Sequence, residues 1–192
     1  MMIGDRSFFA IESEISKAYE QLSLRALGFF VLYVAGRQYG VRKPDATMLA
    51  NSFDEVSRRL ASRGSHTAPF SSTEDAGELA NAVILAQYAE GQDHTLFFGL
   101  SQDEFCQLLH TRGVLWAPDG DEAFDDRSCV LQMDVDDRVR MIAFKRERGY
   151  LYAPTTLSDV WLSASDFYSA LGHWLRAFEE EWRRLPKSKP AC

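Results

Sequence analysis

Carboxylate side chains are concentrated in one short run in the second half of the chain. The acidic members of this run, which we call the acidic loop, are Asp119, Asp121, Glu122, Asp125 and Asp126. Carboxylates this close together can bind a cation, serve as an acid and base pair, or attract a basic protein. A calcium loop is excluded, because Ala123 stands where a ligand belongs and Phe124 where the invariant glycine belongs. Three readings stay open: a solvated loop, a surface for a basic partner, and a metal or catalytic site.

The other residues that could do chemistry lack the neighbours that such chemistry needs. The histidines lie far apart, none at metal-ligand spacing, and are predicted at the surface or at helix ends: His66, His94, His110 and His173. The segment 99–103 imitates a nucleophile elbow but ends in Asp103, where a second glycine is required. No glycine-rich phosphate loop is present. We therefore expect no enzyme, no cofactor and no metal.

Charge and composition narrow the classes of partner. The chain has 192 residues with 21 Lys and Arg against 28 Asp and Glu, a net charge of −7, and 46% hydrophobic residues. Such an acidic surface repels phosphate backbones, so nucleic acid is an unsuitable partner. The basic run 145–148 is explained by a solvated turn. The length suits one globular domain over 1–192.

The cysteines and the apolar segments predict a cytoplasmic location. Cys106, Cys129 and Cys192 are an odd number without a CxxC pair, and the start of the chain does not resemble a secretion signal. We expect a reducing compartment, with Cys106 and Cys129 as packed core thiols. The longest apolar stretch, 26–35, is about half of the ~20 residues that would span a bilayer, so no membrane partner is expected.

Alternating and β-branched patterns predict strands near both ends of the chain. The segment 8–15 reads as a strand with one wet face, on which Ala10, Glu12 and Glu14 lie. Residues 27–34 and 35–41 form an expected antiparallel hairpin with Gly36 in its turn. Residues 128–135 and 138–144 form another around Asp136 and Asp137. A third strand is expected at 149–152 or at 157–162.

Four helices are expected from capping boxes, in which a small polar residue precedes an acid by three positions. The boxes are Ser52 to Glu55, Ser72 to Asp75, Ser101 to Glu104 and Ser163 to Asp166. The last opens a helix over 164–185, whose residues Phe167, Leu171, Trp174 and Phe178 recur at steps of three and four. This spacing keeps one face apolar.

These elements together predict an α+β fold. It has an antiparallel sheet built from strands of both chain ends, packed helices, and a long amphipathic C-terminal helix on that sheet. Residues 65–72 are expected to form a loop and 186–192 a frayed tail.

Several short segments resemble the family of bacterial polymorphic-toxin immunity proteins called immunity protein 42. The resemblance lies in Ile3-Gly4-Asp5 before Phe9-Ala10-Ile11-Glu12, the turn from Gly36 to Gly40, the run 121–126, Val139-Arg140 with Ile142-Ala143-Phe144, and Phe167-Tyr168 with Leu171 and Trp174. The segment 65–116 matches nothing in the family, so these residues could be a helical insertion.

The resemblance implies a cytoplasmic protein that binds and blocks a cognate toxin. An acidic surface would suit a basic toxin, which makes the acidic loop the candidate partner-binding site. Two other functions stay open: a small carboxylate-dependent hydrolase, and an adaptor or scaffold that binds a non-toxin protein. The sequence indicates no oligomeric state.

Overall fold

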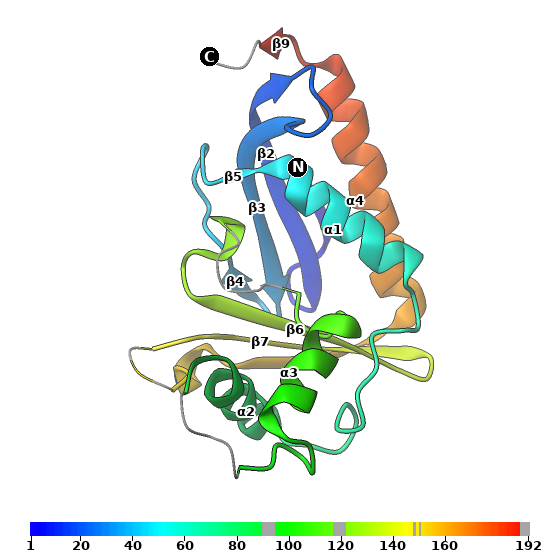
Figure 1. Ribbon diagram of the computed structural model, residues 1–192. Helices are drawn as coiled ribbons and strands as arrows, with labels where there is room; N and C mark the ends of the chain where they lie inside the picture. Colours follow the sequence, from blue (N-terminus) through cyan, green and yellow to red (C-terminus); the bar gives the residue numbers. More distant parts are fainter. Residues whose placement is uncertain (90–94, 117–121, 148, 150, 189–192) are drawn as a thin grey trace.

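The computed structural model describes residues 1–89, 95–116, 122–147, 149 and 151–188, and it has the α+β fold that the sequence predicts (Figure 1). The strands are β1 Met2–Asp5, β2 Phe9–Tyr19, β3 Ala26–Val34, β4 Arg37–Tyr39, β5 Thr47–Met48, β6 Ser128–Val135, β7 Arg138–Lys145, β8 Ser158–Ser163 and β9 Lys187–Ser188. The α-helices are α1 Leu49–Ala61, α2 Ala76–Tyr88, α3 Gln102–Thr111 and α4 Ala164–Arg184, with short 3₁₀ turns η1 Glu122–Phe124 and η2 Pro154–Thr156.

The strands form two sheets, whereas the sequence patterns predicted one. The first sheet has the order β1-β2-β3-β4, with β5 on β3 and β9 on β2, and the second has the order β6-β7-β8. Both predicted hairpins are present, with Val34 opposite Arg37 in one and Val135 opposite Arg138 in the other. The third strand of the second hairpin is the 157–162 alternative. Strand patterns report which residues alternate, but they do not report which strand pairs with which.

The turn between β3 and β4 has the backbone conformation of a tight hairpin. Ala35 and Gly36 both have positive φ, 49° and 80°. Two successive positive φ angles match the twist of the flanking strands. The glycine that the sequence placed in this turn is therefore required by its geometry.

The prediction of one wet face for the first long strand is wrong over the first half of β2. Ala10 is fully buried and Glu12 is nearly so. Glu12 is tolerated inside because its carboxylate accepts hydrogen bonds from Tyr33 at 2.9 Å and from Arg6 and Arg42. A buried carboxylate needs such partners. The alternation of polar and apolar residues therefore led to a wrong prediction of the exposure of this face.

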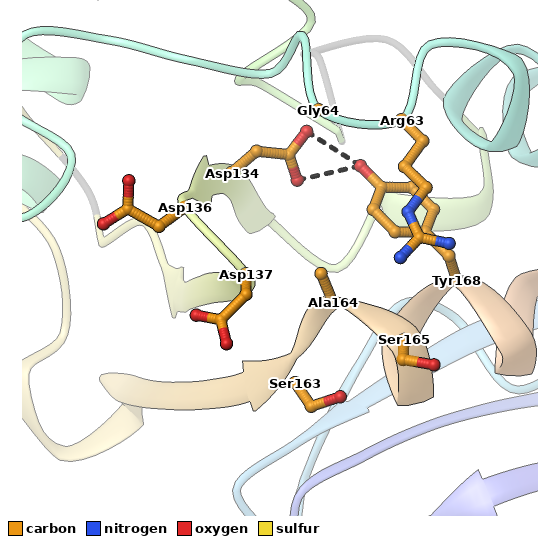
Figure 2. Close-up of a pocket in the computed structure, with 9 residues that line it drawn as sticks. All are labelled: Arg63, Gly64, Asp134, Asp136, Asp137, Ser163, Ala164, Ser165 and Tyr168. Atoms are coloured by element: carbon orange, nitrogen blue, oxygen red, sulfur yellow. Dashed lines mark hydrogen bonds between the residues drawn. The ribbon is translucent and has the colours of Figure 1, made fainter.

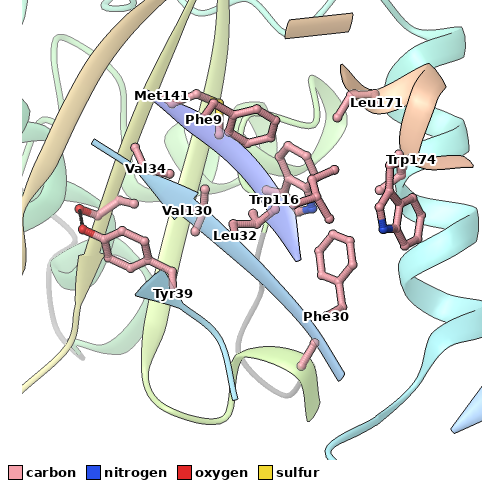
Figure 3. Packing of buried hydrophobic residues seen from close by; sticks show 14 of the residues in the cluster. Phe9, Phe30, Leu32, Val34, Tyr39, Trp116, Val130, Met141, Leu171 and Trp174 are labelled. Atoms are coloured by element: carbon pink, nitrogen blue, oxygen red, sulfur yellow. Dashed lines mark hydrogen bonds between the residues drawn. The ribbon is translucent and has the colours of Figure 1, made fainter. Parts of the chain in front are cut away.

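The larger core lies between the two sheets and α4 (Figure 3). The apolar face of α4 is buried as predicted, and its Trp174 packs edge-on against Phe30 of β3, with ring centroids 5.2 Å apart. The indole Nε1 of Trp174 donates a hydrogen bond to Ser13 of β2. Helix α1 packs beside α4 on the same sheet. The long helix is thus fixed by both apolar and polar contacts.

A second core lies on the opposite face of β6 and β7. Helices α2 and α3 cover this face, and Leu79, Phe105 and Leu109 pack on Ile142 and Phe144. Figure 1 shows these two helices on the side of the second sheet away from α1 and α4. Much of segment 65–116 therefore packs on one face of β6 and β7, and the other face of the same two strands belongs to the larger core. Whether this segment is an insertion stays a prediction.

Two of the four predicted helix starts are confirmed and two are wrong. Ser101 and Ser163 cap α3 and α4, and Ser101 forms a full capping box with Glu104. Helix α1 instead begins at Leu49 without a side-chain cap, so Ser52 lies buried inside the helix. Helix α2 is capped by Asp75, whose carboxylate accepts from the N–H groups of Gly77 and Glu78.

The chain ends and the thiols differ in part from expectation. Residues 187 and 188 are not frayed, because they pair in parallel with Ala18 and Tyr19 of β2. Cys106 and Cys129 are half-buried against the second core, and Cys192 lies outside the described residues.

In the described part of the chain, no helix is both long and apolar enough to cross a membrane.

Candidate functional site

The acidic loop is only partly within the described residues. Asp119 and Asp121 lie outside them. Glu122 and Asp125 are exposed on either side of Ala123 and Phe124, which are buried and anchor the turn. The carboxylates of Glu122 and Asp125 are therefore presented to solvent on a fixed support.

Asp126 differs from its neighbours because the chain itself uses its carboxylate. This carboxylate accepts hydrogen bonds from the N–H groups of Ser128 at 3.1 Å and Gly40 at 3.3 Å, and it forms an ion pair with Lys145. These contacts join the start of β6 to β4 and to the end of β7. The role of Asp126 as a partner contact stays a prediction, and its structural role is already evident.

A second acidic site lies at the other end of the β6–β7 hairpin and was not predicted as a site. A cavity of about 260 Å³ is lined there by Asp134, Asp136 and Asp137 from the hairpin, Arg63 and Gly64 after α1, and Ser163, Ala164, Ser165 and Tyr168 around the start of α4. We call this cavity the acidic cleft (Figure 2). Its sequence signal was the run Asp134-x-Asp136-Asp137, of which Asp134 was assigned to a strand and Asp136 and Asp137 to a turn.

The carboxylates of the acidic cleft have different roles. Asp136 and Asp137 are exposed at the hairpin tip, where Asp136 has a positive φ of 53°. Asp134 is buried, and both of its oxygens lie 2.8 Å from the hydroxyl of Tyr168. Figure 2 shows Arg63 beside the Tyr168 ring, and its guanidinium lies 5.2 Å from the ring centroid. The cleft therefore has a fixed, hydrogen-bonded base and a rim of two exposed aspartates.

A buried polar network holds the base of the cleft in place. The side-chain amide of Gln132 donates to Tyr168, and Arg59 donates to the side-chain oxygen of Gln132, both at 2.9 Å. Arg59 is fully buried and also donates to the carbonyls of Gly113 and Leu115 and to Glu55. Burial lowers the pKa of Arg59 to about 10, although Glu55 opposes this change, so the side chain stays charged at neutral pH.

Burial also controls the protonation of Tyr168 and His66. It raises the pKa of Tyr168, and the hydrogen bond to Asp134 raises it further, so Tyr168 remains a neutral donor. His66 is 2% exposed and lies beyond the end of α1, whereas it was predicted at the surface or at a helix end, and its Nδ1 lies 3.0 Å from the carbonyl of Arg112. A carbonyl only accepts, so this contact places the proton on Nδ1. Burial and the charge of Arg59 lower the pKa of His66.

The described lining of the cleft consists largely of charged and hydroxyl-bearing side chains. It contains carboxylates, hydroxyls and one guanidinium, but neither histidine nor cysteine. Within the described residues no group of three His, Cys, Asp or Glu side chains could hold a metal ion. Cys106 has a raised pKa through burial and then through Asp103, which disfavours the thiolate that a nucleophile needs. The exposed carboxylates can instead attract a cationic surface.

The two acidic sites lie at opposite ends of one rigid hairpin. Ser128 opposite Lys145 marks the end near the acidic loop, and Val135 opposite Arg138 marks the end near the acidic cleft. The eight residues of β6 span about 23 Å at ~3.3 Å per residue. The acidic loop was predicted from the sequence. The acidic cleft could be recognised only from the structure, because the segment after α1 and the start of α4 complete its lining.

The architecture that carries these sites is also found in a solved structure. The chain is similar to the crystal structure of CdiI from Burkholderia dolosa, with a TM-score of 0.56 over 92% of this chain and 99% of that chain. The two sequences are 16% identical, so the likeness concerns the fold. A comparison with curated proteins found no match.

The family follows from the sequence match. The family described as immunity protein 42 matches residues 1–177, so the chain belongs to this family. The predicted resemblance is therefore confirmed, and it extends through the segment 65–116 that had no recognised counterpart. This membership identifies an immunity protein of a toxin system and not an enzyme.

Proposed function

We propose that this protein binds a cognate bacterial toxin and neutralises it by direct contact through an acidic surface. Membership of the immunity protein 42 family and the CdiI-like fold support the neutralising role. The observation that carries the acidic contact is the set of exposed carboxylates at the two ends of the β6–β7 hairpin, Glu122 and Asp125 at one end and Asp136 and Asp137 at the other. We place the neutralisation in the cytoplasm.

Physical chemistry favours such a surface for fast association. The net charge of −7 produces a field that steers a basic partner, and the exposed carboxylates complement it on contact. Exposed charge pairs mainly change the association rate and its dependence on salt. The acidic loop and the acidic cleft can be separated experimentally, because they lie about 23 Å apart along β6 at ~3.3 Å per residue.

The test begins with a search for a toxin gene that ends directly upstream of the gene of this chain, and it uses the toxin domain found there. Producing the toxin alone should stop bacterial growth, and producing both chains should restore it. Association of the purified chains should be fast at low salt and should slow as salt rises. Two double variants, Glu122→Gln with Asp125→Asn and Asp136→Asn with Asp137→Asn, should each be measured over a salt series.

A matched control removes the same charge elsewhere. Asp54 and Glu180 are exposed on α1 and α4 and line neither acidic site, so Asp54→Asn with Glu180→Gln changes the net charge equally. We expect a slower association and a flatter salt dependence for at least one site variant than for this control. Equal rates for all three variants would exclude an acidic contact. A parent chain that neither binds nor protects would exclude the toxin function.

A further inference from the structure

A groove beside the acidic cleft combines apolar walls with acidic edges. It has a volume of about 420 Å³ and is lined by Gly4, Asp5, Phe8 and Phe9 around the β1–β2 turn and by Trp161, Leu162, Ser163, Asp166, Phe167 and Ala170 of β8 and α4. We call it the Phe8 groove. It shares Ser163 with the acidic cleft, so the two hollows adjoin. They connect the edge of the first sheet with the edge of the second.

Phe8 exposes an aromatic ring on a backbone that the fold holds in place. Its side chain is 53% exposed, although its neighbour Phe9 is buried in the core. The backbone of Phe8 is fixed on both sides, because its N–H donates to Asp5 at 3.0 Å and its carbonyl accepts from Ala35 at 2.9 Å. An exposed ring on a fixed turn loses little conformational freedom on binding. Such preorganised aromatic rings are typical binding hot spots.

The indole of Trp161 lies on the other face of the second sheet, because Trp161 pairs with Arg140 whereas its neighbour Leu162 pairs with Val139 on the side of Phe9 and Phe167. Trp161 lies in β8, and the guanidinium carbons of Arg138 and Arg140 lie 4.5 Å and 5.4 Å from its ring centroid. Arg140 is held by Asp159 through two hydrogen bonds. The indole is therefore already covered by two guanidinium groups. The apolar wall of the groove opposite Phe8 is formed by Leu162, Phe167 and Ala170.

The groove itself has acidic residues without a basic one among its described lining. Asp5 and Asp166 are exposed carboxylates at its edges. Arg6 is in the same turn as Asp5, but its guanidinium is directed to Glu12 and lies over the Tyr33 ring. The groove thus offers aromatic surface next to negative charge. Lysine and arginine match this pair of features, because their stems are apolar and their heads are cationic.

We propose that the Phe8 groove is the docking site for a lysine or arginine side chain of the cognate toxin. The stem of that side chain packs against Phe8, Leu162 and Ala170, and its cationic head pairs with Asp5 and Asp166. This inference rests on the proposed function. It adds to that function an anchoring position, distinct from the two acidic sites that attract the toxin from a distance.

The test compares Phe8→Ser and Asp5→Asn with Leu22→Ser, using the toxin domain identified for the test of the proposed function. Leu22 is a matched control, because it is 61% exposed in the β2–β3 connection and does not line the groove. Asparagine at position 5 can still accept the hydrogen bond that Ser7 donates to Asp5, so the turn is kept. We expect Phe8→Ser to raise Kd by about tenfold or more, mainly through faster dissociation, and Leu22→Ser to change it by less than about twofold.

The occupant is identified by a photo-crosslinking amino acid placed at position 8. The crosslinked toxin peptide should contain a lysine or arginine, and replacing that residue by glutamine should remove the effect of Asp5→Asn. Parent-like Kd values for both groove variants, with a parent chain that binds, would reject the groove and leave toxin binding intact. A crosslinked peptide without a basic residue would reject the proposed occupant. A parent chain that does not bind would reject both proposals.

Discussion

Arg59 and Gln132 lie 73 positions apart in the chain, and the guanidinium of Arg59 donates a 2.9 Å hydrogen bond to the side-chain oxygen of Gln132. This contact joins α1 to β6 inside the protein. Through Tyr168 it continues to α4 and to Asp134 at the base of the acidic cleft. One buried charge therefore links two helices and the strand that ends at the cleft.

Replacing Arg59 by methionine should destabilise the fold strongly. The change removes the hydrogen-bond donor for the side-chain oxygen of Gln132 and for two buried carbonyls, and it leaves these acceptors buried without a replacement for that donor. Breaking a buried charged network in this way costs about 3–5 kcal/mol. Urea denaturation measures the loss. Arg58→Met is the control, because Arg58 is exposed and its pair with Glu55 should contribute less than about 1 kcal/mol. Similar losses for both variants would contradict the role of the network.

Trp174→Ala should lower the free energy of unfolding by about 3–5 kcal/mol. The indole is fully buried against Phe30 and Phe178, and its loss also frees the hydroxyl of Ser13. The adjacent exposed residue gives the control, since His173→Ala should change stability by less than about 0.5 kcal/mol. If the Trp174→Ala protein were as stable as the parent, the packing of this face of α4 would not contribute to the stability of the core.

The start of α2 can be tested by comparing two possible caps. Asp75→Ala should cost about 1 kcal/mol, because the carboxylate accepts from two otherwise free N–H groups. Ser72→Ala should stay within about 0.5 kcal/mol, because Ser72 is exposed and lies outside the helix. Thermal unfolding of both variants distinguishes the observed cap from the predicted one. A larger loss for Ser72→Ala would favour the sequence prediction.

The acidic loop should divide into structural and solvent-exposed carboxylates. Asp126→Ala should cost about 1–3 kcal/mol, because it leaves the N–H groups of Ser128 and Gly40 and the Lys145 ammonium without their partner. The triple change of Asp121, Glu122 and Asp125 to Asn, Gln and Asn should leave stability equal or slightly higher, since it removes repulsion among carboxylates that are close together in the chain. Unfolding and toxin association should be measured on the same proteins. A parent-like association rate of the triple variant at low salt would exclude the acidic loop as a contact.

Stability should fall as the pH drops below the ordinary pKa of histidine. The pKa of His66 is lowered in the folded protein from the usual 6.5, so the unfolded chain binds the proton first. The stabilising contribution of neutral His66 is complete above pH 6.5 and decreases as the pH falls from there through the folded-state pKa. His66→Gln should show a smaller loss between pH 7 and pH 5 than the parent. An identical pH profile for the two proteins would show that His66 is not the group responsible.

The sequence predicted the elements whose evidence is local. The C-terminal helix follows from a face repeated every three to four residues, and the β6–β7 hairpin from two β-rich runs around Asp136 and Asp137. Predictions from local patterns were wrong where residues distant in sequence determine how a side chain is paired or where a helix begins. Ser52 looked like a cap, yet α1 begins at Leu49 because β5 leads directly into the helix. Glu12 looked exposed, yet Tyr33 and two arginines satisfy its charge inside the sheet.

Sequence alone determined the acidity of this protein, its α+β class, the apolar face of α4 and its resemblance to the immunity protein 42 family. Each of these depends on composition or on residues close together in the chain. Only the tertiary structure determined that the strands divide into two sheets, that Arg59 is buried, and that Phe8 and Trp161 line one groove. Such features depend on residues that are distant in sequence, and their burial and pairing are fixed only when the chain packs.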